Sequence, residues 1–394
     1  MAIYIILAVV LWLMALIEAA QQRRMSDWPG YFALFLFVAF AGTRFETGYD
    51  WMAYQETFAD APTFYGVMTG QQSIFSFTPM ERLYAFLNVF VKSLWGDIQV
   101  LFFLTALFNG IVIFRFAKRF GGHPAFCLAF YFCFAYLTGQ MTLVRQSLAS
   151  SFVFLAIMFY FDEKKYRAVV LALSALGFHI SAVMFYPIVG FLRLKPSRAL
   201  TVGLILTGLV IYFFSDSVVG VALEGVKLIS FGYVDEKVNE YMSLGGYKRS
   251  IGSLVYIGIN IGFVWLSVVD GERKNWPAIE RLFFYFCLML VLSQLFFGPL
   301  PVIWNRIQIV VVVMQSCVFT IHLQSYKVTD RLFLVAPAAI LSLIVLAYFL
   351  ARPRMEPFIP YQSTLEQLFY DDVGDGRLRL EGAIRDSVAE DLFE

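Results

Sequence analysis

The chain has 394 residues, of which 60% are hydrophobic and only 15% are charged. Soluble domains carry about 25% charged residues, so this chain cannot build a large water-exposed surface. Its formal net charge of +1 argues against nucleic acid as a partner, because nucleic-acid-binding proteins present a strongly basic face. The composition predicts an all-α, polytopic membrane protein.

Runs of roughly 20 apolar residues, the length needed to cross the hydrocarbon core, recur along the chain. The first is predicted to be a span rather than a cleaved signal, because Arg23 and Arg24 follow it and no basic region precedes it. With two ambiguous segments, the runs predict a bundle of about 11–13 transmembrane or re-entrant helices within residues 1–350. The clear candidates are residues 3–20, 28–42, 98–116, 124–139, 142–161, 200–215, 250–269, 280–297, 304–322 and 331–350.

The connections rich in lysine and arginine predict the orientation, because cytoplasmic loops carry an excess of both residues. The first periplasmic loop is then residues 43–79, the second is 216–249, and a short C-terminal tail, 351–394, lies on the same side. The basic connections predicted to be cytoplasmic are residues 21–27, 115–119, 162–167, 193–198, 270–274 and 322–331.

Two segments do not fit a simple count of spans. Residues 79–95 carry a weakly polar stripe opposite an apolar one, so we expect an amphipathic helix at the interface or in the bundle, with a true span as the alternative. Residues 166–192 are basic at both ends and are interrupted by Gly177 and His179. We expect two short helices there, entering the membrane and returning, since such breaks are tolerated where they line a cavity.

Polar residues inside apolar runs are informative, because an intramembrane charge costs at least about 2.5–3.5 kcal/mol unless it is paired or shielded. Arg145 opens a span at its predicted outer end and is followed by Gln146 and two serines. An arginine that only anchors the helix at the interface is the alternative, but it would not need polar neighbours on several helix faces.

A second arginine, Arg306, also opens a span from the predicted outer side, next to Asn305. It should therefore lie at the same depth as Arg145. Two guanidinium groups at one level repel each other unless they share an anion. Pyrophosphate suits them, because guanidinium binds phosphate oxygens through paired hydrogen bonds.

His179 lies where the segment 166–192 is interrupted. A lone histidine in an apolar run is more often a packed core residue, which is the structural alternative. Gly177 and Ser181 on either side indicate an irregular, hydrated turn. An imidazole with a pKa near 6.5 can act as a base in such a turn.

The first predicted outer loop carries charges interleaved with aromatic residues. One interpretation is a solvated interfacial loop with aromatic anchors. The other is a sugar platform, because aromatic faces stack on pyranose rings and carboxylates accept hydrogen bonds from hydroxyls. Tyr361 of the tail returns to the same face, and residues 365–394 predict a helical appendage or a loosely ordered tail. The loop residues concerned are Arg44, Glu46, Tyr49, Asp50, Trp51 and Tyr54.

Motifs for nucleotides, metals and serine-hydrolase chemistry do not occur in the sequence. The four cysteines lie inside apolar runs at spacings that suit neither zinc nor a disulfide framework, so we interpret them as small buried residues. The sequence therefore predicts no cofactor and no metal. Any reaction must use a substrate that arrives already activated.

Taken in order, five segments resemble the EpsG-like family of Wzy-type polysaccharide polymerases. Each segment is weak alone, but the ordered set is fairly specific and extends from residue 42 to about residue 310. Family members typically show a Gly-Asp-Tyr order in the first loop, where this chain has Gly48, Tyr49 and Asp50. The segments are GTRFETGYDWMAY (42–54), MERLYAFLN (80–88), VRQSLA (144–149), GFHISA (177–182) and NRIQ (305–308).

The resemblance implies a glycosyltransferase of the bacterial inner membrane. It would join undecaprenyl-pyrophosphate-linked repeat units at the periplasmic face, in exopolysaccharide, capsule or O-antigen assembly. Partners would be the lipid-linked donor and acceptor and membrane lipid, with a chain-length regulator protein as a further candidate. On this hypothesis Arg145 and Arg306 bind the pyrophosphate and His179 is the base, with Asp50 as the alternative. The residues predicted to bind substrate are Arg44, Glu46, Tyr49, Tyr54, Glu81, Gln146, Asn305 and Tyr361.

Three other functions remain open from the sequence. An O-antigen ligase uses the same donor but typically has one large outer loop, and residues 216–249 are modest in length. A polyprenyl-phosphate-dependent glycosyltransferase would show an acidic pair in its first outer loop, usually with a metal, which Glu46 and Asp50 imitate poorly. A polysaccharide transporter would need no base.

Overall fold

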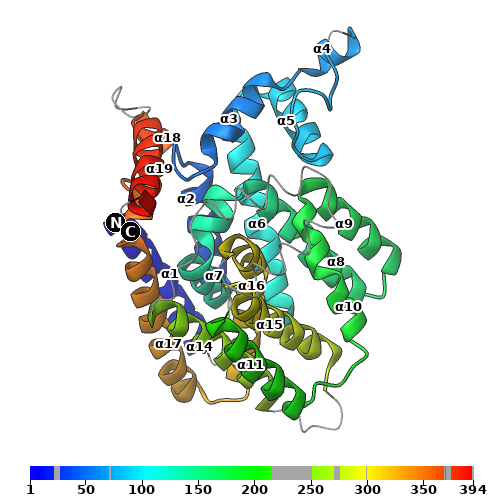
Figure 1. Cartoon of the computed structure of the whole chain (residues 1–394), viewed down its shortest axis with the longest axis vertical. Coiled ribbons are helices and arrows are strands. Elements are labelled where there is room, and N and C mark those ends of the chain that lie inside the picture. Colours follow the sequence, from blue (N-terminus) through cyan, green and yellow to red (C-terminus); the bar gives the residue numbers. More distant parts are fainter. Residues whose placement is uncertain are drawn as a thin grey trace. The chain divides into compact units, whose positions relative to one another are not determined.

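In the structure of the chain, a computed structural model, the regular secondary structure of the described residues is helical, apart from one isolated β-bridge (Figure 1). The all-α prediction is therefore confirmed. The predicted second outer loop, 216–249, and the basic connection 270–274 lie outside the described residues. The described residues are 1–21, 27–70, 72–214, 251–269, 276–298, 300–367, 369 and 374–392.

The chain divides into two compact units. The first comprises Met1–Val183 and Thr320–Glu394, and the second comprises Met184–Phe319. The helices of the first unit are α1 (Ala2–Ala20), α2 (Trp28–Gly42), α3 (Trp51–Asp60), α4 (Phe64–Met68), α5 (Arg82–Leu94), α6 (Ile98–Phe120), α7 (Pro124–Phe134), α8 (Val144–Phe161), α9 (Lys165–Phe178), α17 (Val328–Leu350), α18 (Thr364–Gln367) and α19 (Gly376–Leu392).

The second unit contains α10 (Pro187–Phe191), α11 (Arg198–Phe213), α14 (Ile251–Val269), α15 (Ala278–Phe296) and most of α16 (Pro301–Leu323). Buried amides join three of its helices. The Asn260 side chain donates to Gln294 Oε1 at 2.9 Å and accepts from Gln315 Nε2 at 2.8 Å. Because these amides satisfy one another, they can be buried between apolar helices at little cost.

The clear candidate spans lie on helices, but the candidate 124–139 is divided: α7 ends at Phe134, too short to cross the hydrocarbon core alone, and a π-helix begins at Leu137. In the described part of the chain, α1, α6, α8, α15, α16 and α17 are the six helices that are long and apolar enough to cross a membrane. Shorter apolar helices, among them α2, α7, α11 and α14, accompany them. The chain is a polytopic membrane helix bundle, as the sequence predicts.

Helix α5 resolves one ambiguous segment. Its 13 residues rise about 20 Å, too short to cross a hydrocarbon core of about 30 Å alone, which favours the amphipathic interpretation over the span. The polar stripe faces inward, with Ala85 and Asn88 buried, whereas Phe86, Phe90 and Leu94 are exposed. A helix with its apolar stripe outward contacts lipid rather than water.

The second ambiguous segment is interrupted at His179, as predicted. Helix α9 ends at Phe178, His179 adopts an extended conformation, and a 3₁₀ helix, η2 (Ile180–Phe185), follows. Gly177 lies inside α9, where a Cβ would come within 2.6 Å of Leu83 on α5. The glycine therefore permits close packing of α9 against α5 and does not itself break the helix.

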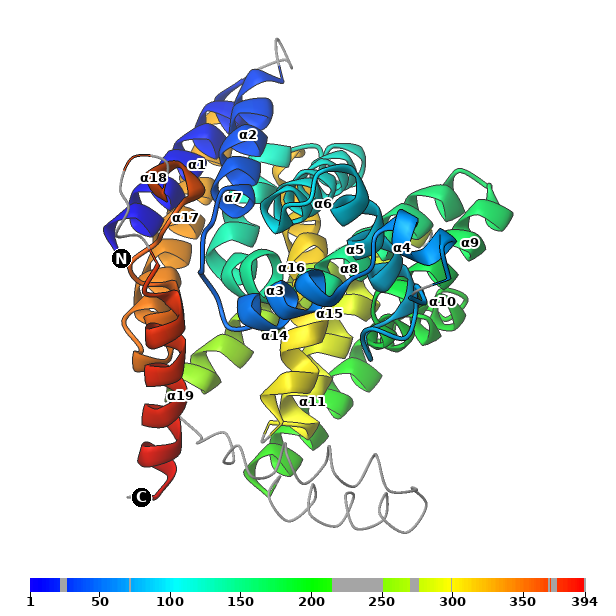
Figure 2. The ribbon, with the colours of Figure 1, turned by 90° about the horizontal axis from the view of Figure 1, so that it is seen from above.

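Polar loops and helix ends gather at one end of the first unit, where Figures 1 and 2 show α3, α4 and α5 together. The opposite end carries basic groups, with Lys118 bonded to Asp27 and Arg119 to Asp162. The predicted division of the loops between two sides of a membrane stays a prediction.

The chain after α17 returns to the first loop rather than leaving the bundle. A 3₁₀ helix, η3 (Pro353–Phe358), precedes a cis Ile359–Pro360 peptide bond, and α18 and α19 follow. Helix α19 packs against η3. Among the described residues of 365–394, α18 and α19 are helical, which fits the helical-appendage alternative.

Candidate functional site

The carboxylate of Glu81 joins two of the predicted catalytic residues. Glu81 Oε2 accepts a hydrogen bond from Arg145 Nη1 at 2.5 Å, and Glu81 Oε1 lies 2.5 Å from His179 Nδ1. Oε1 also accepts from the backbone N–H of Ile180 at 3.3 Å. Residues from three separate segments of the chain thus form one charged cluster, which we call the Glu81 site.

Each of the three side chains extends from the end of a helix. Glu81 is the N-cap residue of α5, Arg145 lies in the first turn of α8, and His179 is the C-cap residue of α9. Because α9 packs on both α5 and α8, these ends come together at one place. Helix ends suit such a site, since their unpaired backbone groups already favour polar surroundings.

A π-helix, η1 (Leu137–Thr142), directly precedes α8. It therefore determines where α8 begins and so the position of Arg145 in the first turn of that helix. Asn109 of α6 holds both elements. Its side-chain nitrogen donates to Gln140 Oε1 at 3.2 Å and to Ser147 Oγ at 2.9 Å. Single-turn π-helices frequently occur at functional sites, because they shift the register of the following helix.

The surroundings of Glu81 keep it ionised. Burial would raise its pKa, but the hydrogen bond with His179 and the charge of Arg145 outweigh burial and lower the pKa to about 2. The side chains remain partly open, with exposed fractions of 26% for Arg145, 19% for Glu81 and 11% for His179. The cluster is therefore both charged and accessible.

The geometry prepares His179 to accept a proton. Because the ionised Glu81 binds the Nδ1 side of the ring, it favours the tautomer with hydrogen on Nδ1. The Nε2 atom then carries the lone pair, and it has no hydrogen-bond partner among the described residues. Ser181 Oγ, two residues on, is buried and also lacks a partner within the described part of the chain.

Tyr54 of the first loop borders the Glu81 site, and Asp50 lies close to Tyr54. Asp50 is the N-cap residue of α3, and the buried Tyr54 lies one turn further along this helix. Burial and the neighbouring Asp50 raise the pKa of Tyr54 to about 12, while Arg145 acts in the opposite direction through its contact with the phenol. The phenol therefore stays protonated and can donate a hydrogen bond.

Arg44 lies in an aromatic environment and is 2% exposed. Its guanidinium carbon is 4.3 Å from the centre of the Phe102 ring, and its Nη1 donates to the carbonyl of Ala41 at 2.8 Å. Its Nε and Nη2 have no hydrogen-bond partner among the described residues. Burial lowers the pKa of Arg44 to about 10, which still leaves it charged at neutral pH.

Other predicted residues of the first loop and tail contact the protein itself. Glu46 Oε2 accepts from the backbone N–H of Gly376 at 3.2 Å. Tyr361 stacks on Phe40, with ring centres 4.0 Å apart, and donates to the Phe40 carbonyl. Tyr49 packs edge-on against Phe358. Their predicted role in sugar binding stays a prediction.

The remaining predicted residues lie in two places. Gln146 is buried in the first turn of α8, where its carbonyl accepts from Ser150 Oγ at 2.8 Å. Arg306 and Asn305 are partly buried on α16, in the second unit. The predicted pairing of Arg145 with Arg306 on one pyrophosphate therefore stays a prediction.

Sequence reasoning included Glu81 only as a substrate-binding residue. It lies 98 positions from His179 and 64 from Arg145, so no spacing rule predicts the contacts. A signal was present, however. Glu81 introduces the polar stripe of an otherwise amphipathic segment, and an acidic residue near the predicted depth of two basic residues indicates a partner. Within the described residues, no three metal-binding side chains come together as a ligand set.

A comparison with protein-family models matches the chain to the EpsG family over residues 27–363. This range is most of the chain and contains every residue of the Glu81 site. Neither the curated proteins nor the solved structures include a match to the chain.

Proposed function

The chain belongs to the EpsG family of membrane polysaccharide polymerases. On that premise we propose its glycan donor, its catalytic site and the glycosyl-transfer step that it catalyses. It joins undecaprenyl-pyrophosphate-linked oligosaccharide repeat units at the periplasmic face of the inner membrane. The bond formed is a glycosidic bond between two repeat units. The leaving group is the lipid pyrophosphate.

In the proposed step, a hydroxyl oxygen of the acceptor sugar attacks the anomeric carbon of the donor. The hydroxyl proton moves to Nε2 of His179, and the bond between the anomeric carbon and the pyrophosphate oxygen breaks. The pyrophosphate leaves with the bonding electron pair, and Arg145 stabilises its developing negative charge. The proton then passes to solvent, so no cofactor is consumed.

Glu81 contributes through its hydrogen bonds with both His179 and Arg145. Its carboxylate retains hydrogen on His179 Nδ1, stabilises the imidazolium that forms, and orients the Arg145 guanidinium. Arg145 uses only Nη1 toward Glu81, and the guanidinium has further N–H groups for phosphate oxygens. Arg44 and Arg306 are the candidates for additional contacts with the pyrophosphate.

One observation carries the proposal: a single ionised carboxylate joins a histidine and an arginine in a partly exposed position within a membrane bundle. A structural ion pair needs no histidine whose second ring nitrogen lacks a partner among the described residues. A transporter needs no base. The observed cluster therefore favours the polymerase over the transporter.

The test uses purified protein and lipid-pyrophosphate repeat units, with polymer length and released lipid pyrophosphate measured together. We expect Glu81→Gln to fold and to polymerise about 10- to 100-fold more slowly, the effect of losing hydrogen bonds to charged partners. A Glu81→Gln enzyme with the wild-type rate would rule out this assignment of the site. Transfer to an unrelated lipid acceptor without chain growth would identify a ligase instead.

The predicted side of the membrane is tested separately. Reporter fusions after Asp60 should report the periplasm and fusions after Lys165 the cytoplasm, because α5 and α9 present the Glu81 site at the end away from Lys165. A cytoplasmic signal at Asp60 would place the site on the wrong side for this donor.

A further inference from the structure

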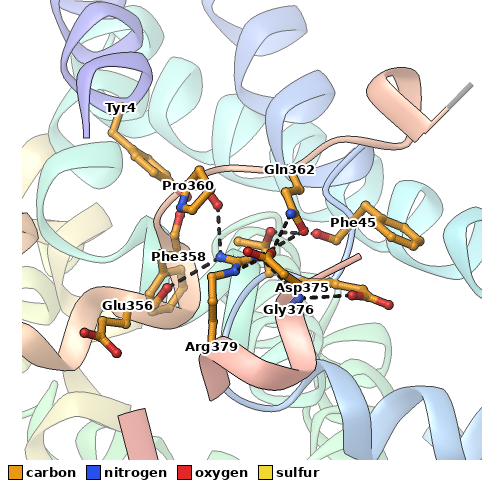
Figure 3. Close-up of polar contacts among 11 residues, drawn as sticks. Tyr4, Phe45, Glu356, Phe358, Pro360, Gln362, Asp375, Gly376 and Arg379 are labelled. Carbon is orange, nitrogen blue, oxygen red and sulfur yellow. Dashed lines mark hydrogen bonds and ion pairs between the residues drawn. The ribbon is translucent and has the colours of Figure 1, made fainter. Parts of the chain in front are cut away.

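The side chain of Arg379 on α19 connects the C-terminal helix to the first loop (Figure 3). Its Nη1 donates to the carbonyl of Pro360 at 3.0 Å. Its Nη2 donates to Gln362 Oε1 at 2.9 Å and to the carbonyl of Glu46 at 3.3 Å. The Nε donates to Asp375 at 2.8 Å. One guanidinium thus binds three parts of the chain.

The neighbouring Gly376 makes a second contact with the same loop. Its N–H donates to Glu46 Oε2 at 3.2 Å, and an added Cβ would lie only 2.3 Å from the carbonyl oxygen of Glu46. Only glycine allows this approach. The Arg379 side chain is 11% exposed, so its hydrogen bonds are largely shielded from water.

The segment between η3 and α18 pairs with the first loop along its backbone. Phe45 N donates to the Gln362 carbonyl at 2.9 Å, and Thr364 N donates to the Thr43 carbonyl at 2.8 Å. An antiparallel bridge joins Arg44 to Ser363 between these two bonds. The C-terminal segment therefore provides the backbone partners of the loop.

The far side of the loop packs against η1. Gly48 has a φ of +106°, and an added Cβ would lie 2.6 Å from the carbonyl oxygen of Met141. Gly48 N donates to the Pro357 carbonyl at 3.0 Å. The loop is thus held between the C-terminal segment and the π-helix that precedes Arg145. It leads directly into Asp50 and α3, whose Tyr54 borders the Glu81 site.

We infer that Arg379 is a positioning residue for polymerisation: with Gly376, it fixes the first loop so that Tyr54, next to Asp50, is held beside Arg145. This inference rests on the proposed function of the Glu81 site. Residues 364–394, which include α19, lie beyond the range that the family model matches.

The chain offers a matched control on the same helix. Arg377 lies two positions from Arg379 but is 70% exposed, and among the described residues it bonds only to Glu381, one turn along α19. Removing Arg377 takes away the same charge without touching the loop. If α19 only packed on the bundle, replacing Arg377 and replacing Arg379 would have the same effect on the first loop and on the rate of polymerisation.

The first experiment measures hydrogen exchange of residues 43–50 in the purified full-length protein. We expect Arg379→Ala to exchange these amides about tenfold or more faster, since hydrogen bonds from a charged group are lost. Arg377→Ala should match wild type. Gly376→Ala, which keeps Arg379 but displaces the helix from Glu46, should act like Arg379→Ala. Unchanged exchange in both Arg379→Ala and Gly376→Ala would overturn the inference.

The second experiment measures kcat and KM with lipid-pyrophosphate repeat units. We expect Arg379→Ala to lower kcat about tenfold, within the 10²-fold that a 1 Å misplacement of a reacting group can cost, and to change KM less. Arg379→Lys, which keeps the charge but makes fewer hydrogen bonds, should recover part of the rate. Faster exchange with a wild-type kcat would refute the positioning role. Failure of Glu81→Gln to lower the rate would instead refute the proposed function.

Discussion

Two glutamate–histidine pairs lie at opposite ends of the first unit. Glu81 and His179 form one, with a 2.5 Å contact, and Glu18 and His123 form the other, with their nearest atoms 3.8 Å apart. Both histidine side chains are 11% exposed. Residue type and burial alone do not distinguish the two pairs.

The carboxylates differ in what their oxygens bind. Glu18 accepts hydrogen bonds from the backbone N–H groups of Ala125 and Phe126, at 3.3 and 3.2 Å, in the first turn of α7. A carboxylate at a helix N-terminus satisfies backbone donors and interacts favourably with the helix dipole. Glu81 binds two side chains in addition to the backbone N–H of Ile180, and one of these side chains can exchange a proton. The comparison teaches that a Glu–His pair indicates a catalytic role only when the carboxylate makes a direct hydrogen bond to the imidazole.

The sharpest test replaces each histidine. His179→Ala should lower the rate of polymerisation about 10²- to 10⁴-fold, the usual effect of removing a general base, while the protein still folds and binds lipid. His123→Ala should keep a near-normal rate per folded molecule. Polymer yield and membrane protein level are measured together. Equal rates for the two variants would remove the distinction between the pairs.

A smaller effect is expected from the arginines. Arg145→Lys keeps the charge but loses the planar fork, so we expect about tenfold or more loss, short of the 10²- to 10³-fold seen when a transition-state donor is removed. Arg119→Lys is the control, because Arg119 pairs with Asp162 at the opposite end of the unit. Normal polymer from Arg145→Lys at normal protein level would make Arg145 an anchor.

Glu18 should affect stability rather than rate. Glu18→Gln weakens the bonds to the start of α7 and should cost about 1 kcal/mol, typical of a helix cap. The rate per folded molecule should not change. Thermal unfolding in detergent, followed by the polymerisation assay on the same sample, separates the two effects. A slow but fully stable Glu18→Gln protein would contradict the structural role of this pair.

The smallest effect is a pH dependence of stability. The pKa of Glu81 is lowered from 4.5 to about 2 in the folded state, so its stabilising contribution is present above about pH 4.5. It is lost as the pH falls toward 2. The difference in Tm between wild type and Glu81→Gln should therefore shrink from pH 5 downward. A constant difference over that range would show that Glu81 gains nothing from its partners.

The sequence by itself determined the family, the membrane class and nearly every helix. The length of an apolar run is a local property of the sequence. Within lipid, such a run satisfies its own backbone hydrogen bonds by forming a helix. The helices α1, α6, α8 and α17 are therefore predicted directly. The interruption at His179 was also visible. The amphipathic stripe of 79–95 predicted a helix, although the sequence could not show that its polar side faces inward.

Only the tertiary structure decided which polar residues meet. Arg145, Glu81 and His179 come from segments separated by up to 98 positions, and a helix end specifies no partner at that distance. The same holds for Arg379, which lies in a segment with an ordinary soluble composition yet reaches the carbonyl of Glu46, 333 positions away. Apolar periodicity reports which face of a helix is buried. The pairing of charges depends on how helices pack against one another, and that is decided by the whole bundle.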